Sequence, residues 1–582
     1  LLSRPVATRQ ELEKWILDAT RFETVEPFIR QLLSRPVATR QELEKWILDR
    51  GELTAQISEA RANLYITMTC DTEDAAAQRA YLTYIEEVTP KLTPLFFELD
   101  KRLVELESRI GLDPARYGVL LRAARADVDL FREENVPLET QLAVLGQKYD
   151  SICGAMTVQF EGEEQTLPRM ARYQEVTDRG LRERAWRATA ERRLRDADAI
   201  DAVYDEMVRT RDRVGRNAGF PNFIGYAYKS KHRFDYGPEH CRAFHDACEK
   251  VVVPFARRLE RERAALLGVE TLRPWDLSVD VKGRAPLRPF TNGADLIAKG
   301  RDCFDRLDPT LARMFRSLGD GTEARGSRDG AGLDLDSRKG KAPGGYQYMR
   351  DRSRRPFIFM NAAGLQRDIE TLVHEAGHAF HSLLSREEPI LEYRSAPIEF
   401  CEVASMSMEL LSMPHWRGTF YSSEEDFRRA CRQNLKHSVL LLPWTAQIDA
   451  FQHWVYANPG HTREERRREW LALEDRFGGI ADWSGLEDIR ASLWHRQLHL
   501  FGLPFYYIEY GIARLGALQL WLHAIEHGEA AAVRNYVKGL SLGGSRPLPD
   551  LFAACGLAFD FGAATVERLV ERVAIEMEKV PE

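Results

Sequence analysis

Two histidines and a glutamate with a spacing suited to metal-assisted hydrolysis stand at His374, Glu375 and His378. Apolar residues recur around them at helical spacing, which predicts a helix. On a helix, residues four apart lie on one face, so both imidazoles can reach one zinc ion at about 2.0–2.1 Å. Glu375 can then hold the attacking water and accept its proton.

A helix can carry this pattern by chance, because only three positions are fixed. Two features favour the metal site. Three of the 14 histidines fall within 374–381. Gly377 also stands inside the predicted helix, at a cost of about 1 kcal/mol relative to alanine, and the close approach of another segment would explain it.

His381 lies on the same face, but it is seven residues from His374. That spacing is about 10.5 Å along a helix axis, which is too far for both residues to bind one ion. We therefore predict that His381 supports the site or the core and does not bind metal. The longer three-histidine zinc motif is rejected, because it would need glycine at 381 and histidine where Leu384 stands.

A third metal ligand must come from elsewhere, and a carboxylate is the natural type. Residues 398–411 are predicted to form a second helix, with Glu402 and Glu409 on one face and the small residues Ala404 and Ser405 for close packing. We assign Glu402 as the ligand and Glu409 as the acceptor for a ligand histidine. The acidic residues considered were Glu387, Glu388, Glu392, Glu399, Glu402 and Glu409.

The elements that position these residues are predicted to be mostly α-helical, with helical patterns at about 50–150 and from about 366 nearly to the end. Alternating residues at 155–160, followed by a Glu-Gly pair, predict a hairpin. One long charged helix is predicted at about 180–213. Residues 318–345, rich in Gly, Asp, Arg and Lys, are predicted to form a mobile loop.

A small β-element is predicted directly before the metal-binding helix, with strands at 346–349 and 357–360. The second strand is a candidate edge strand, to which an extended peptide could bind through its backbone; an ordinary buried strand is the alternative. The glycine pairs 344–345 and 543–544 are either points of close substrate approach or plain turns. The candidate substrate-binding residues are Phe357, Ile358, Phe359, Met360, Gly344 and Gly345.

The overall composition excludes several classes. The 582 residues are 44% apolar and 29% charged, as in globular proteins, and the net charge of -7 argues against a nucleic-acid binder. No apolar run is long enough for a membrane span. The eight cysteines are scattered and contain no C-x-x-C motif, which suits a reducing cytoplasm. The chain begins with Leu1, so a removed leader stays open.

Residues 1–18 recur without change at 32–49. An unchanged pair differs from solenoid repeats, which drift in detail. The second copy begins with a capping-box pattern, Thr39 and Glu42, and is expected to pack as a native helix. The first copy is predicted not to be integral to the fold.

The remainder divides into an N-terminal helical region with a short hairpin, 19–200, and a catalytic domain that contains the metal-binding helix, 201–582.

Towards the C-terminus, Tyr507 and Tyr510 are three apart, and their hydroxyls could donate to a developing oxyanion, as could His499. A tyrosine-rich helix can equally have a purely structural role, in the core or in the wall of a channel. His495 is a less favoured competitor for the role of His499.

The segments HEAGHAFH and EFCEVASMSMELL resemble the thimet oligopeptidase family, and its oligoendopeptidase F branch in particular. Further similar stretches are RKGKAPGGY, PFIFMNAAG, PFYYIEY and LSLGGS, which together span about 338–545. The resemblance implies zinc binding by the residues matching His374, His378 and Glu402, with Glu375 as base. It also implies substrate or oxyanion contacts from a histidine and the tyrosine pair 507 and 510. Alanines at 362–363 depart from the bulkier polar residues frequent there.

The sequence therefore predicts a cytoplasmic zinc endopeptidase that acts on short peptides, with neither nucleic acid nor membrane as partner. The oligomeric state stays open. The resemblance implies two helical lobes around a deep substrate channel. One alternative is a dipeptidyl or carboxypeptidase, in which an arginine among 350, 352, 354 and 355 would bind the terminal carboxylate. The other is a non-catalytic peptide-binding scaffold, which the intact Glu375 disfavours.

Overall fold

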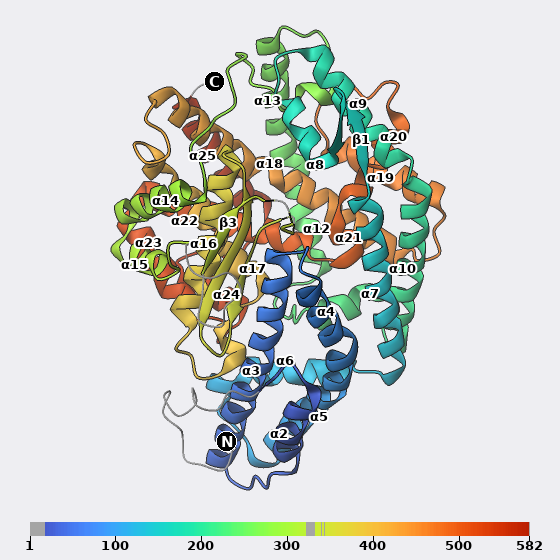
Figure 1. Ribbon diagram of the computed structural model, residues 1–582, viewed down its shortest axis with the longest axis vertical. Coiled ribbons are helices and arrows are strands. Elements are labelled where there is room, and N and C mark those ends of the chain that lie inside the picture. Colours follow the sequence, from blue (N-terminus) through green and yellow to red (C-terminus); the bar gives the residue numbers. More distant parts are fainter. Residues whose placement is uncertain (1–17, 322–331, 339, 343, 581–582) are drawn as a thin grey trace. The chain divides into compact units, whose positions relative to one another are not determined.

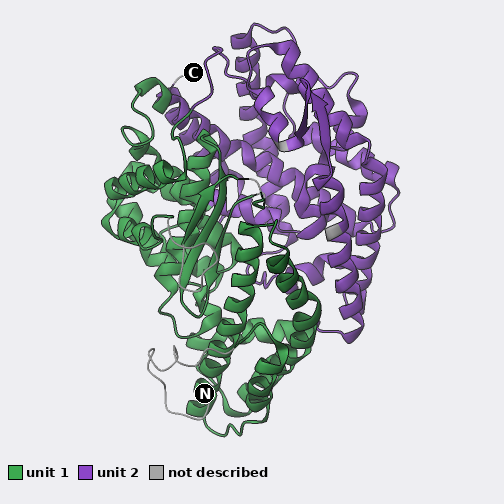
Figure 2. Ribbon diagram, viewed as in Figure 1, with its two compact units in different colours: residues 1–129, 288–427, 516–559 green, residues 130–287, 428–515, 560–582 purple. Residues whose placement is uncertain are grey.

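The computed structural model describes residues 18–321, 332–338, 340–342 and 344–580 (Figure 1). Helices dominate, with two small sheets, so the mostly α fold is confirmed. The chain forms two compact units (Figure 2). Unit 1 comprises residues 1–129, 288–427 and 516–559, and unit 2 comprises 130–287, 428–515 and 560–582. The predicted division at residue 200 followed the chain linearly and stays a prediction.

Unit 1 begins with a helical group whose core contains the second copy of the repeated segment. Thr39 caps α3, and the predicted capping box with Glu42 is formed. Trp46 is fully buried, and its indole Nε1 donates to Leu32 O at 3.0 Å. The first copy lies outside the described residues, apart from Asp18. The helices of this group are α2 (Phe22–Ser34), α3 (Arg40–Cys70), α4 (Ala75–Thr83), α5 (Thr89–Ile110) and α6 (Pro114–Leu130).

The larger sheet of unit 1 has the order β3-β5-β4, with β3 parallel and β4 antiparallel to β5. The strands are β3 (Leu333–Asp336), β4 (Tyr346–Arg350) and β5 (Arg355–Ala362). The predicted strands at 346–349 and 357–360 are confirmed. The predicted edge position of Phe357, Ile358, Phe359 and Met360 is wrong, because β5 is central and these side chains are buried.

Strand β3 was not predicted, because it lies inside the segment predicted as a loop. It pairs with the edge of β5 opposite β4. The part of that loop at 322–331 lies outside the described residues. Buried apolar residues along β5 are typical of a strand covered on both faces. The other helices of unit 1 are α14 (Gly293–Leu307), α15 (Pro309–Arg316), α16 (Gln366–Ser385), α17 (Ile398–Leu411), α23 (Glu529–Leu540) and α24 (Leu548–Ala554).

Unit 2 contains the predicted hairpin, formed by β1 (Thr157–Phe160) and β2 (Glu163–Thr166). Glu161 and Gly162 both have positive φ, as a two-residue type I′ turn requires. The predicted single helix at 180–213 is wrong, because Arg195 and Asp196 separate α9 (Arg179–Leu194) from α10 (Ala197–Asn217).

The long helix α18 begins at the end of unit 1 and continues into unit 2. No helix in the described part of the chain is both long and apolar enough to cross a lipid bilayer. The remaining helices of unit 2 are α7 (Val136–Gly154), α8 (Leu167–Met170), α11 (Phe223–Ser230), α12 (Pro238–Ala247), α13 (Val253–Leu267), α18 (Glu424–Ala457), α19 (Arg463–Phe477), α20 (Glu487–Ala491), α21 (Leu498–Gly502), α22 (Tyr507–His527, continuing into unit 1) and α25 (Ala563–Glu578).

Candidate active site

Helices α16 and α17 of unit 1 carry the predicted metal ligands and pack closely against each other (Figure 1). A Cβ at Gly377 would lie 2.5 Å from Ala404 O and 2.6 Å from Ser405 Cα. No side chain fits there, so the approach predicted from this mid-helix glycine is confirmed. The short distance between the helices brings a carboxylate of α17 to the histidines of α16.

The side chains of His374, His378 and Glu402 converge, with one donor atom from each within 4.8 Å of the others. Glu402 Oε2 lies 3.4 Å from His374 Nε2 and 3.6 Å from His378 Nε2. Donors about 2.0–2.2 Å from a tetrahedral zinc stand roughly 3.3–3.6 Å apart, so the spacing fits that ion. These three donors leave a fourth position for water or substrate, as in catalytic zinc sites.

Neighbouring groups hold each ligand in the form that binds metal. His374 Nδ1 donates to Glu409 Oε1 at 2.7 Å, which makes Nε2 the nitrogen that can face a metal ion. The Cys401 carbonyl is the hydrogen-bond partner of His378, whose burial lowers its pKa to about 4 and keeps the ring neutral. Ser405 Oγ donates to Glu402 Oε2 at 2.9 Å.

The charges around the ligands also favour a cation. Burial opposes ionisation of Glu402, but the two histidines and Ser405 lower its pKa to about 2. Burial likewise opposes protonation of His374, yet Glu402 and Glu409 raise its pKa well above the usual value. Two carboxylates therefore require a positive charge between them, and a metal ion can replace the imidazole proton.

Glu375 lies beside this cluster and is not one of its three ligands. It is buried, which raises its pKa to about 7, and its carboxylate accepts a hydrogen bond from the Gln347 backbone N–H of β4. A carboxylate with a pKa near neutrality can take up and release a proton near neutral pH. Sequence patterns gave no sign of Gln347, because its contribution comes from the backbone.

His381 lies outside the donor cluster. It is buried against Phe400, with ring centroids 5.8 Å apart, and burial lowers its pKa to about 3. Its Nε2 has no hydrogen-bond partner among the described residues.

Gly344 and Gly345 form the entry to β4. Gly344 has a φ of +98°, and Asn361 Nδ2 donates to its carbonyl at 3.0 Å. A Cβ at Gly345 would lie 3.4 Å from Phe359 O. A turn and a close backbone approach thus account for both glycines, and their contact with substrate stays a prediction. Gly543 packs even more tightly, because its Cβ would lie 2.0 Å from Tyr393 O.

In unit 2, His499, Tyr507 and Tyr510 form a single aromatic group. The His499 ring lies 5.1 Å from the Tyr507 ring and 5.8 Å from the Tyr510 ring, and the two tyrosine rings are 5.4 Å apart. Gln497 Nε2 donates to His499 Nδ1 at 2.7 Å and so orients the imidazole. We call these three residues the tyrosine cluster; its part in catalysis stays a prediction.

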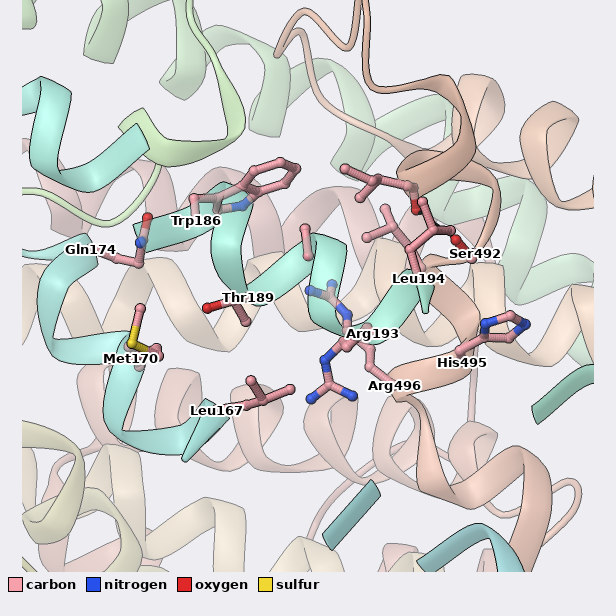
Figure 3. Close-up of a pocket in the computed structure, with 14 residues that line it drawn as sticks. Leu167, Met170, Gln174, Trp186, Thr189, Arg193, Leu194, Ser492, His495 and Arg496 are labelled. Carbon is pink, nitrogen blue, oxygen red and sulfur yellow. Dashed lines mark hydrogen bonds between the residues drawn. The ribbon is translucent and has the colours of Figure 1, made fainter. Parts of the chain in front are cut away.

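His495, the less favoured competitor, lies apart from this cluster in a cavity of about 230 Å³ within unit 2. Figure 3 shows His495 to one side of Arg193 and Arg496, which lie among apolar side chains. His495 Nε2 is 3.4 Å from Asp201 Oδ1. None of the residues that line this cavity is a predicted metal ligand, base or member of the tyrosine cluster.

A buried H-E-x-x-H helix with a glutamate ligand from a second helix defines a zinc-type metallopeptidase site. The model of peptidase family M3 matches residues 172–571, and the model of the peptidase M3 N-terminal domain matches residues 16–131. The chain belongs to peptidase family M3, a family of metallopeptidases.

Individual relatives agree with this assignment. The chromosomal oligoendopeptidase F of Lactococcus lactis subsp. cremoris is 23% identical over 269 residues, which are 43% of this chain and 42% of that protein. The match thus spans less than half of the relative's length. The structure of PZ peptidase A with an inhibitor aligns over 100% of this chain and 99% of its own, at 28% identity and a TM-score of 0.86.

A Bacillus anthracis str. Ames structure assigned to oligoendopeptidase F covers 96% of both chains at 26% identity, with a TM-score of 0.82. The family resemblance drawn from the sequence is therefore confirmed.

Proposed function

We propose that this protein is a zinc-dependent endopeptidase that hydrolyses short peptides. The observation that carries the proposal is the convergence of His374, His378 and Glu402 at zinc-ligand spacing, with Glu375 beside them. The match to oligoendopeptidase F supports the preference for peptides. The eight cysteines, none of which forms a disulfide, support a cytoplasmic location.

In this proposal His374, His378 and Glu402 hold the zinc ion, which would supply a Lewis acid and lower the pKa of a water molecule to about 7. Glu375 accepts the proton of the attacking water and then delivers it to the leaving amine. Burial raises the pKa of this carboxyl above its usual value, which favours uptake of the proton. Glu409 keeps the His374 ring oriented.

Strand β4 is the proposed binding edge for the substrate backbone. Within the described sheet β4 pairs only with β5, and its Gln347 N–H is bonded to Glu375. An extended peptide that adds to this edge would run beside the base, with backbone hydrogen bonds that tolerate many side chains. Strand β4 thus takes the substrate-binding role that was predicted for β5, because the backbone of β5 already pairs with a strand on each side.

We further propose that Tyr507 and Tyr510 donate to the oxyanion of the tetrahedral intermediate, with His499 as a third donor. Burial raises the pKa of Tyr507, so its hydroxyl keeps its proton near neutral pH and can act as a donor.

The carboxypeptidase alternative needs an available cation near the strands. Arg350 is buried and donates to Asn63 Oδ1, and Arg354 contacts Glu52 and Glu387. These partners favour a structural role for both arginines.

The discriminating experiment uses a ten-residue peptide acetylated at its N-terminus and amidated at its C-terminus, with mass spectrometry of the products. An endopeptidase cleaves it internally, a chelator abolishes the cleavage, and zinc restores it. Failure to cut the blocked peptide, with cleavage of the unblocked peptide from its end, would instead support the carboxypeptidase.

A further inference from the structure

A second group of metal-ligand type lies inside unit 2 and shares no residue with the proposed reaction. Helix α18 carries Asp449 and His453, four residues apart on one face, and α12 presents Cys241 to them. One donor atom from each residue lies within 4.8 Å of the others. His453 Nε2 is 3.4 Å from Asp449 Oδ2, a separation that matches two ligands of one tetrahedral zinc, roughly 3.3–3.6 Å.

The two oxygens of the Asp449 carboxylate differ in their partners. Asp449 is fully buried, and a buried charge without adequate partners is costly. The contacts from His245 Nε2 at 2.9 Å and His453 Nε2 at 3.4 Å both reach Oδ2. Oδ1 has no hydrogen-bond partner in the described part of the chain. An ion bound to this carboxylate would supply the missing compensation.

Cys241 and Tyr228 complete the surroundings. Cys241 is 1% exposed, and the Tyr228 hydroxyl lies 2.9 Å from its Sγ and 3.2 Å from His453 Nε2. The hydroxyl is thus in reach as a fourth ligand. The Arg233 guanidinium stacks over the Tyr228 ring at 5.1 Å and is ion-paired with Glu509, so its charge is already balanced.

We infer that Cys241, Asp449 and His453 form a second, structural metal site for zinc or a similar thiolate-binding divalent cation. A thiolate and a carboxylate together carry two negative charges, which neutralise such an ion in a buried site. The nitrogen, sulfur and oxygen donors suit zinc, whereas calcium and magnesium prefer oxygen alone. The site lies within one unit, where it would join α12 to α18.

Cobalt substitution separates this site from the one at His374 and His378. A cysteine thiolate bound to Co²⁺ gives a near-ultraviolet charge-transfer band, and the first cluster contains no cysteine. The full-length chain is stripped with a chelator, titrated with Co²⁺ and followed by absorbance and elemental analysis. The second site predicts two equivalents of metal per chain and a thiolate band.

Four variants assign the band. Cys241→Ser should abolish it and remove one equivalent, while Cys248→Ser, at another buried cysteine of unit 2, should keep it. His378→Ala should remove the other equivalent and leave the band, so failure of the catalytic proposal is recognised separately. His453→Gln replaces Cys241→Ser if the serine variant does not fold, as judged by circular dichroism.

The inference is overturned by one equivalent and no thiolate band in the parent chain, in which case the cluster is a hydrogen-bonded network with a charged imidazole. A band that survives Cys241→Ser and His453→Gln would also overturn it. Neither result depends on peptidase activity.

Discussion

The two ligand clusters have the same construction and different surroundings. Each uses two residues four apart on one helix, His374 and His378 on α16 or Asp449 and His453 on α18, with a third from another helix. The two histidine side chains of the first cluster are 22% and 18% exposed. In the second cluster, Asp449 is fully buried.

The two clusters differ in their exposure to solvent and in the residue that follows their first ligand. These differences indicate a catalytic role for the first cluster and a structural role for the second. The first cluster has Glu375 beside it and can admit water and substrate, as a catalytic site must. The second has a fully buried Asp449, a Cys241 that is 1% exposed and a His453 side chain that is 14% exposed. A tyrosine and a histidine are its neighbours, which suits a structural site. Helical spacing alone thus indicates metal binding, and access to solvent with an adjacent base indicates catalysis.

The largest effect is expected from Glu402→Gln, which should affect the first ligand cluster and not the second. The amide lacks the charge that balances a divalent ion, so the first cluster should lose its metal and peptide cleavage should fall to background. The metal of the second cluster should remain. Elemental analysis and turnover of a blocked peptide check both points.

The control is Glu387→Gln, at an exposed glutamate of the same unit. Full metal content with full activity in Glu402→Gln would remove Glu402 from the ligand set.

Tyr510→Phe tests whether the tyrosine cluster takes part in catalysis. Loss of one oxyanion donor lowers kcat by roughly 10²–10³-fold. KM should change little, because the bond strengthens in the transition state. Tyr507→Phe is the parallel test, and Tyr173→Phe, outside the cluster, is the control. An unchanged kcat in both cluster variants would show that the two tyrosines have only a structural role.

Gly377→Ala tests the close packing that brings α17 to α16. The added Cβ would overlap Ala404 O, so we expect a loss of about 1–3 kcal/mol in the free energy of unfolding. Gly118→Ala in α6 is the matched control, since its Cβ would meet no atom within 4 Å. Alanine should stabilise that helix by up to about 1 kcal/mol. Urea denaturation measures both, and equal stabilities would refute the packing argument.

The smallest effect is expected from deletion of residues 1–18, which should leave metal content and activity unchanged. In the second copy, Trp46→Ala should cost about 3–5 kcal/mol, because that side chain is fully buried. Thermal denaturation and turnover compare the two. Inactive but folded and metal-loaded protein after the deletion would show that the first copy has a role.

The parts of the site that were predictable arise from short-range patterns. The spacing of His374 and His378 on a helix, and the face shared by Glu402 and Glu409, follow from local periodicity. The central position of β5 did not, because its second partner, β3, lies within the glycine-rich segment predicted as a loop. The break between α9 and α10 was also missed, since neither glycine nor proline marks residues 195–196.

The second cluster could not be predicted from sequence patterns for the same reason. Asp449 and His453 form a local pair, but Cys241 comes from a helix about two hundred residues earlier, and only tertiary packing brings it near. The tyrosine pair lay within reach of sequence reasoning, whereas Gln347 acts through its backbone N–H, which no side-chain pattern reveals.

The central claim is that Glu375 is a base beside the metal and not one of its ligands. The most direct test measures bound zinc and turnover of a blocked peptide on the same preparation of Glu375→Gln. The account predicts a zinc content equal to that of the parent chain and a kcat lowered by roughly 10²–10⁴-fold. Loss of zinc from this variant, or a kcat equal to that of the parent, would contradict the account.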